Sequence, residues 1–133
     1  MKTEGSAKVL IDTSAWIAFF RKEKPLYEKV SALMDDDLIV CCGIVYAELL
    51  QGVKTEKELS SLKDFLHVFE FPEEHAKLWE EAGELSFRLR KKGKSPGLAD
   101  CYIAVLARRN GYSILTLDGH FKDLTKEAGI ACL

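Results

Sequence analysis

Short, largely apolar runs alternate along the chain with longer stretches in which apolar residues recur every three or four positions. Such short runs, rich in Val, Ile and Leu, are typical of strands buried on both faces of a parallel sheet. Buried strands are therefore expected at 9–11, 38–42 and 113–117, with short strands at 67–71, near an edge, and at 130–132. Helical spacing predicts helices over 15–20, 25–34, 44–50, 56–66, 73–92, 96–110 and 121–127.

The order of these elements indicates the fold class. Strands separated by helices favour a central, mainly parallel sheet with helices on both faces, which is an α/β/α arrangement. The chain has 133 residues, of which 47% are hydrophobic, and this suits one domain over 1–133 with one core. We therefore expect a single α/β domain.

Small and polar residues mark the expected helix ends. Thr13 or Ser14 is expected to cap the first helix, and Ser95 with Pro96 to open the helix that ends before Gly111. The helix over 73–92 is expected to bury a face made of Ala76, Trp79, Ala82, Gly83, Leu85, Ser86 and Leu89.

The charge balance neither requires nor excludes a nucleic-acid partner. Lys and Arg number 19 against 21 Asp and Glu. A protein that coats a phosphate backbone is usually basic, whereas a nuclease that holds its substrate through metal ions need not be. The four cysteines lack zinc-like spacing, as expected for reduced core residues in the cytoplasm. Residues 1–6 have no apolar core typical of a signal peptide, and no membrane span is expected.

Two acidic residues follow predicted buried strands. Asp12 comes directly after 9–11, and Asp118 directly after 113–117. The carboxyl ends of parallel strands share one edge of a sheet, and ligands bind at that edge in open α/β folds. Both acids therefore point to a common site, although Asp118-Gly119 is also a typical turn pair.

Two more acids are expected near the same edge. Glu48 is flanked by apolar residues in the helix after the second strand, and Asp100 lies near the start of its helix. Each also has a simpler interpretation, as a solvated side chain for Glu48 and a helix-capping acid for Asp100. Four carboxylates in one cleft repel one another strongly, so their convergence requires a cation.

The expected cation is Mg²⁺ or Mn²⁺, because carboxylate oxygens suit hard divalent ions and no His or Cys set favours zinc. One or two such ions in a carboxylate cluster suit the hydrolysis of phosphodiester bonds. The candidate metal ligands and catalytic residues are Asp12, Glu48, Asp100 and Asp118. Ser14 and Thr116 are candidate hydrogen-bond donors to a ligand carboxylate or to a water on the metal.

A basic stretch ends the helix predicted over 73–92. Cations suit a helix carboxyl terminus, so a charged cap explains the stretch as well as a contact with RNA phosphates does. The candidate RNA contacts are Arg88, Arg90, Lys91, Lys92 and Lys94.

Four short motifs around the acids resemble those of the PIN-domain family, and within it the VapC-like toxins of toxin–antitoxin pairs. They are Ile11-Asp12-Thr13-Ser14, Ala47-Glu48-Leu49-Leu50-x-Gly52, Leu98-Ala99-Asp100-x-x-Ile103-Ala104 and Leu115-Thr116-Leu117-Asp118-x-x-Phe121. They occur in the family's order and spread over nearly the whole chain. Many relatives have a further acid or Asn before the Phe, where this chain has His120.

This resemblance implies a compact α/β/α domain with Mg²⁺- or Mn²⁺-dependent ribonuclease activity. Asp12, Glu48, Asp100 and Asp118 match the family's acidic positions, and Ser14 matches its frequent hydroxyl. The resemblance also implies a homodimer that is inhibited by a small antitoxin protein. Such antitoxins lay a helical or extended tail over the active site, often with a basic residue pointing into it.

Two alternatives remain open at this point. A PIN nuclease for RNA processing would use the same residues without an antitoxin. A non-catalytic PIN or receiver-like binding module would keep the fold. A receiver, however, needs a pair of acids near its first strand, where this chain has Asp12 alone, and a Lys after a late strand, whereas no Lys closely follows Thr116 here. In the first helix, Trp16, Phe19 and Phe20 fit either a partner contact or the core.

Overall fold

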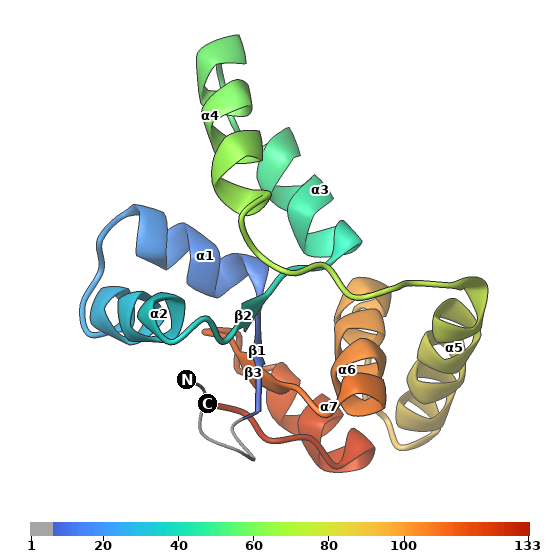
Figure 1. Ribbon diagram of the computed structural model, residues 1–133. Helices are drawn as coiled ribbons and strands as arrows, with labels where there is room; N and C mark the ends of the chain where they lie inside the picture. Colours follow the sequence, from blue (N-terminus) through green and yellow to red (C-terminus); the bar gives the residue numbers. More distant parts are fainter. Residues whose placement is uncertain (1–6) are drawn as a thin grey trace.

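The computed structural model describes residues 7–133, which form a three-stranded sheet and seven helices (Figure 1). The elements are β1 (Val9–Ile11), α1 (Thr13–Phe20), α2 (Leu26–Asp35), β2 (Ile39–Val40), α3 (Gly43–Gln51), α4 (Glu56–Leu66), α5 (Ala76–Lys91), α6 (Leu98–Asn110), β3 (Ser113–Leu115) and α7 (Phe121–Ala128). Residues 1–6, where no signal peptide is expected, lie outside the described range. No helix in that range is long and apolar enough to span a bilayer.

The sheet is parallel, and β1 runs in its centre between β2 and β3. Val9 of β1 pairs with Ile39 of β2 and with Ser113 of β3. The strands are almost entirely buried, as their apolar composition predicts. In Figure 1, α1 and α2 lie on one side of the sheet, and α5 and α6 lie on the other. The predicted α/β arrangement with a central parallel sheet is therefore confirmed.

The strands predicted at 67–71 and 130–132 are wrong in extent. Each supplies one residue that bridges to a neighbouring strand, Glu70 to β2 and Cys132 to β3. The chain before Glu70 is still completing the turn that ends α4, and Pro72 has no N–H to donate to a ladder. The sequence pattern thus located the sheet edges but overestimated how far pairing extends along them.

Two helices begin later than predicted. α5 begins at Ala76, three residues late, because Glu74 is held by contacts with α3 and α6 rather than by a helical turn. α6 begins at Leu98, and its N-cap is Gly97 rather than Ser95. The predicted opening of this helix is therefore wrong by two residues.

The buried face of α5 is rotated relative to the predicted one. Trp79, predicted to be buried, keeps 44% of its surface exposed. The neighbouring Leu78 occupies the core position instead, in line with Ala82, Leu85 and Leu89. The opposite face of the helix therefore presents Ala76, Trp79 and Gly83 to solvent.

The core is centred on α6, which is buried without interruption from Cys101 to Ala107. A helix that is apolar on all sides is stable only when other elements surround it. Gly111 ends the helix in the left-handed conformation, with φ of 71°, which glycine adopts without steric cost. Burial raises the pKa of both Cys41 and Cys42 to about 12, so these thiols act as small core residues.

Candidate active site

Asp12 stands where β1 ends and is almost fully buried, with 5% of its surface exposed. Its backbone N–H donates to the Leu115 carbonyl of β3 at 2.9 Å, which fixes it beside the neighbouring strand. The hydroxyls of Ser14 and Thr116 both donate to Asp12 Oδ2 at 2.8 Å. Hydrogen bonds to an ionised acceptor are stronger than neutral ones, and two of them fix the carboxylate in one orientation.

The predicted cap of α1 is wrong, and the reason concerns the site. Asp12, rather than Thr13 or Ser14, is the N-cap residue. Ser14 Oγ donates to Asp12 instead, and Thr13 Oγ1 donates to Glu48 Oε1 at 2.8 Å. The two hydroxyls at this corner therefore orient acids of two different elements rather than the end of their own helix.

The segment after β3 is tied to the same corner. The backbone N–H of Leu117 donates to Ser14 Oγ at 3.1 Å, and that of Asp118 donates to Thr116 Oγ1 at 3.0 Å. Asp118 Oδ1 accepts the backbone N–H of His120 at 2.9 Å and lies 3.0 Å from His120 Nδ1. Asp118 is therefore both a turn residue and part of the acidic edge.

Asp100 reaches this edge from the first turn of α6. Burial, together with the negative charges of Asp12, Asp118 and Glu48, raises its pKa from 3.8 to about 6, while His120 acts in the opposite direction. Only groups that lie near one another interact in this way. The structure thus brings together all four acids that the sequence singled out.

The carboxylate oxygens at this edge of the sheet are suitable ligands for a hard divalent ion. No three His, Cys, Asp or Glu side chains of residues 7–133 form a ready-made metal site. The half-buried Asp100 carboxylate nevertheless has no hydrogen-bond donor in this part of the chain and faces three other acids. An oxygen-only set with this charge suits Mg²⁺ or Mn²⁺ and does not suit zinc.

The chain matches a known family over most of its length. The family model described as PIN domain matches residues 9–127. The chain belongs to the PIN-domain family. All four acids of the site lie within the matched part of this PIN domain. The comparison with curated proteins finds no match.

Solved structures with a similar PIN fold come from VapBC complexes. A chain of VapBC2 from Rickettsia felis, bound to a promoter DNA fragment, is 25% identical, with coverage of 94% and 96% of the two chains and a TM-score of 0.75. A chain of DNA-bound VapBC from Salmonella typhimurium is 20% identical, with coverage of 96% and 98% and a TM-score of 0.75. A chain of VapBC-1 from nontypeable Haemophilus influenzae is 22% identical, with coverage of 94% and 96% and a TM-score of 0.72.

The basic stretch of this PIN domain is partly neutralised. Lys92 Nζ lies 2.6 Å from Glu127, and Lys94 Nζ lies 3.1 Å from Asp123, so both lysines fasten the end of α5 to α7. Lys91 lies over an aromatic ring of its own helix. These contacts favour the charged-cap interpretation for Lys92 and Lys94, and RNA contact by Arg88, Arg90, Lys91, Lys92 and Lys94 stays a prediction.

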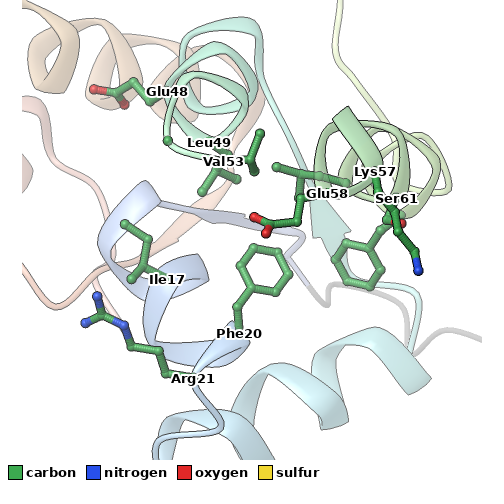
Figure 2. Close-up of a pocket in the computed structure, with 12 residues that line it drawn as sticks. Ile17, Phe20, Arg21, Glu48, Leu49, Val53, Lys57, Glu58 and Ser61 are labelled. Atoms are coloured by element: carbon green, nitrogen blue, oxygen red, sulfur yellow. The ribbon is translucent and has the colours of Figure 1, made fainter. Parts of the chain in front are cut away.

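A pocket of about 760 Å³ opens between α1, α3 and α4, and Glu48 is the one acid of the site that lines it. Its apolar lining consists of Ile17, Phe20, Leu49, Val53, Leu62 and Phe65. Figure 2 shows Phe20 near its middle, with Glu48 at one end and the Glu48 carboxylate directed away from the ring. Trp16 is fully buried. Trp16 is therefore a core residue, whereas Phe20 lines the pocket, and a partner contact by the aromatic residues of α1 stays a prediction.

Sequence reasoning missed two groups that position the acids. Thr13 stands next to Asp12 in the first motif, and the presence of a hydroxyl residue beside this acid was the only signal in the sequence. Glu74 has no sequence signal at all, because it accepts from the Gly43 N–H at 2.9 Å and from the Tyr102 hydroxyl, which both lie far away in the chain. Through these contacts Glu74 connects α3 and α6, the helices that carry Glu48 and Asp100.

Proposed function

We propose that this PIN domain is a Mg²⁺- or Mn²⁺-dependent endoribonuclease, and that it is the toxin of a VapBC-type toxin–antitoxin pair. The nuclease proposal rests chiefly on Asp100, whose half-buried carboxylate lacks a donor in the described chain and faces three further acids. A carboxylate placed in this way needs a cation. A divalent ion at this edge of the sheet is suited to phosphodiester hydrolysis.

Asp12 and Asp100 would hold the ion, with Glu48 and Asp118 completing the set directly or through water. When bound, the ion supplies Lewis acidity toward water and phosphate. Ser14 and Thr116 keep Asp12 Oδ2 occupied and so aim Oδ1 at the cleft. Thr13 holds one oxygen of Glu48, which leaves the other to orient the attacking water.

The test is cleavage of a mixed pool of structured and single-stranded RNA in Mg²⁺, Mn²⁺ or EDTA. We expect cutting only with metal, and a loss of about 100-fold or more in Asp12→Asn, because a direct ligand contributes at least as much as its supporting groups. Asp36→Asn, in an exposed turn, is the matched control and should cut normally. Cutting in EDTA, or full activity of Asp12→Asn, would reject the assignment. No cutting of this pool or of total cellular RNA would favour the non-catalytic module.

Thr13→Val tests whether the hydroxyl positions Glu48. The variant keeps the side-chain shape but cannot donate to Glu48, so we expect cleavage to fall about tenfold with little change in the free energy of unfolding. Thr13→Ser keeps a donor and should recover most of the rate. Initial rates together with urea unfolding separate the two effects. An unchanged rate in Thr13→Val would show that Glu48 needs no support from α1.

The toxin proposal is supported by the likeness to chains from VapBC complexes and by the apolar pocket, which ends at Glu48. An antitoxin helix seated there would lie directly beside Glu48. An RNA-processing nuclease with no antitoxin would carry the same acids, so only the partner separates the two functions.

Ile17→Arg places a charge on the exposed wall of this pocket. We expect a small antitoxin protein that co-purifies with this chain to inhibit the wild type and to bind Ile17→Arg at least about 30-fold more weakly. RNA cleavage by the free variant should be normal. Val68→Arg, which is exposed and away from the pocket, is the control. Equal inhibition of Ile17→Arg and the wild type would place the antitoxin elsewhere.

A further inference from the structure

Two exposed leucines stand beside the acids of the candidate site. Leu98 is 52% exposed and begins α6, two residues before Asp100. Leu117 is 56% exposed and lies between Thr116 and Asp118. A single exposed leucine needs no explanation, whereas apolar side chains gathered at a functional site indicate contact with a ligand.

The start of α6 brings Leu98 next to the Asp100 carboxylate. A Cβ atom added to Gly97 would lie 3.5 Å from Asp100 Oδ2, so this carboxylate lies against the first residues of the helix. Leu98 follows Gly97 directly, and it stays exposed although the helix is buried without interruption from Cys101 to Ala107. Leu98 therefore borders the acid on which the nuclease proposal chiefly rests.

The segment that carries Leu117 is held in place by the same hydroxyls that orient Asp12. The Leu117 N–H donates to Ser14 Oγ at 3.1 Å, and the Asp118 N–H donates to Thr116 Oγ1 at 3.0 Å. Both hydroxyls in turn donate to Asp12 Oδ2. Because the backbone of Leu117 is already fixed relative to Asp12, no loop has to be ordered when a ligand contacts this side chain.

The two leucines border one cleft. Burial and the charges of Asp12, Asp118 and Glu48 together raise the pKa of Asp100, so the acid beside Leu98 lies near the acid beside Leu117. The cleft therefore combines two kinds of surface, carboxylates that suit a divalent ion and exposed aliphatic side chains next to them. A nucleotide has the matching combination, since it carries a charged phosphate and a flat, largely apolar base on one ribose.

We propose that Leu98 and Leu117, which we call the leucine rim, contact the bases next to the phosphate held at the acids, so that the chain cuts RNA where these bases are unpaired. This inference rests on the proposed function. In a duplex the faces of the bases are stacked on their neighbours, so a leucine reaches a base face only in a loop, a bulge or a single strand.

An aliphatic rim recognises a base without reading its identity. Leucine makes only van der Waals contacts with the face of a base, whereas base identity is read through hydrogen bonds to the base edges. The leucine rim therefore selects for an unpaired base at the cut and leaves the sequence preference to other residues. A protein partner covering the same leucines is the competing explanation, and under it their replacement would leave RNA cleavage by the free chain unchanged.

The test removes the leucines and the bases in turn. An RNA from the mixed pool that the wild type cuts is synthesised with one abasic nucleotide, placed on each side of the cut in turn. We expect at least one abasic RNA to lower kcat/KM of the wild type about tenfold, mainly through KM, because the contact holds the ground state and the transition state alike. The double variant Leu98→Ser, Leu117→Ser should cut the intact RNA about tenfold less efficiently and lose nothing further on that abasic RNA.

The matched control is Val68→Ser, which removes an exposed apolar side chain from the turn after α4, a segment that carries none of the four acids. It should behave like the wild type on every RNA, and the double variant should melt at the wild-type temperature because both leucines are exposed. A complementary strand across the cut should prevent cleavage by the wild type.

Three results would overturn the leucine rim while leaving the nuclease assignment in place. They are normal cutting of intact RNA by the double variant, an equal loss on abasic RNA in the double variant and the wild type, and efficient cutting of the duplex. A wild type that cuts no RNA with metal would instead reject the proposed function, and the leucine rim with it.

Discussion

Asp100→Asn is expected to abolish RNA cleavage and, in the absence of metal, to make the protein more stable at pH 8. The pKa of Asp100 rises from 3.8 to about 6 on folding, because the carboxylate is half-buried and faces three other acids. The folded state therefore binds the proton more tightly than the unfolded chain does. The stability that protonated Asp100 contributes is fully present below about pH 4. It is lost as the pH rises through 6, and it stays lost above that value.

Asparagine carries no charge and avoids this loss. The full pKa shift of Asp100 corresponds to roughly 3 kcal/mol of unfolding free energy. The carboxylate is half exposed and solvent screens it, so we expect the free energy of unfolding to rise by about 1 kcal/mol in Asp100→Asn. Urea unfolding in EDTA should show this gain at pH 8 and no gain at pH 4. Asp36→Asn should show neither effect. If Asp100→Asn were less stable than the wild type at pH 8, the four acids would not be in conflict in the folded chain.

Trp16→Ala should destabilise the fold by about 3–5 kcal/mol, which is a large part of the stability of a typical domain. Trp16 is fully buried, and its ring contacts those of Phe19, Phe20, Phe65 and Phe69 at centroid distances of 5.5–5.7 Å. Truncation would remove the centre of this cluster and leave a cavity between α1 and α4. The measurement is urea unfolding followed by circular dichroism.

Trp16→Phe is the informative comparison. The indole N–H of Trp16 is buried with no acceptor among the described residues, so Phe removes an unpaired polar group together with part of the ring. We expect it to cost well under half as much as Ala. A loss below about 1 kcal/mol in Trp16→Ala would mean that the cluster repacks around the gap.

The strand-end acids could be predicted from sequence because their position follows from local order. An apolar run that ends in an acid places that acid at the carboxyl edge of a parallel sheet, and this was sufficient for Asp12. Asp118 lies near the same edge, but the strand predicted over 113–117 ends at Leu115, so Asp118 belongs to the turn that follows β3. The helix over Glu56–Leu66 was predicted to the residue for a similar reason, since its apolar spacing is regular and Thr55 caps it through a hydrogen bond to the Glu58 N–H.

Three features of the structure depend on tertiary contacts and could not be predicted from the sequence. Whether Glu48 faces the cleft depends on the rotation of α3, which its contact with Thr13 helps to fix and no periodicity encodes. The start of α5 depends on Glu74, whose partners lie on other elements. The exposure of Trp79 depends on which of two adjacent apolar residues the core accepts, and apolar spacing alone allowed either one.

The position of α3 gives the molecule a mechanical property. Glu48 lies on the side of this helix that faces the acidic edge, and Leu49 lines the apolar pocket. The first N–H of the helix, that of Gly43, donates to Glu74. The pocket and the acidic edge therefore share one wall. Any tilt of α3 about its anchored end changes the width of the pocket and the separation of Glu48 from Asp100 at the same time. A molecule bound in the pocket would thus inhibit the site by moving Glu48, without contacting the cleft where the acids meet.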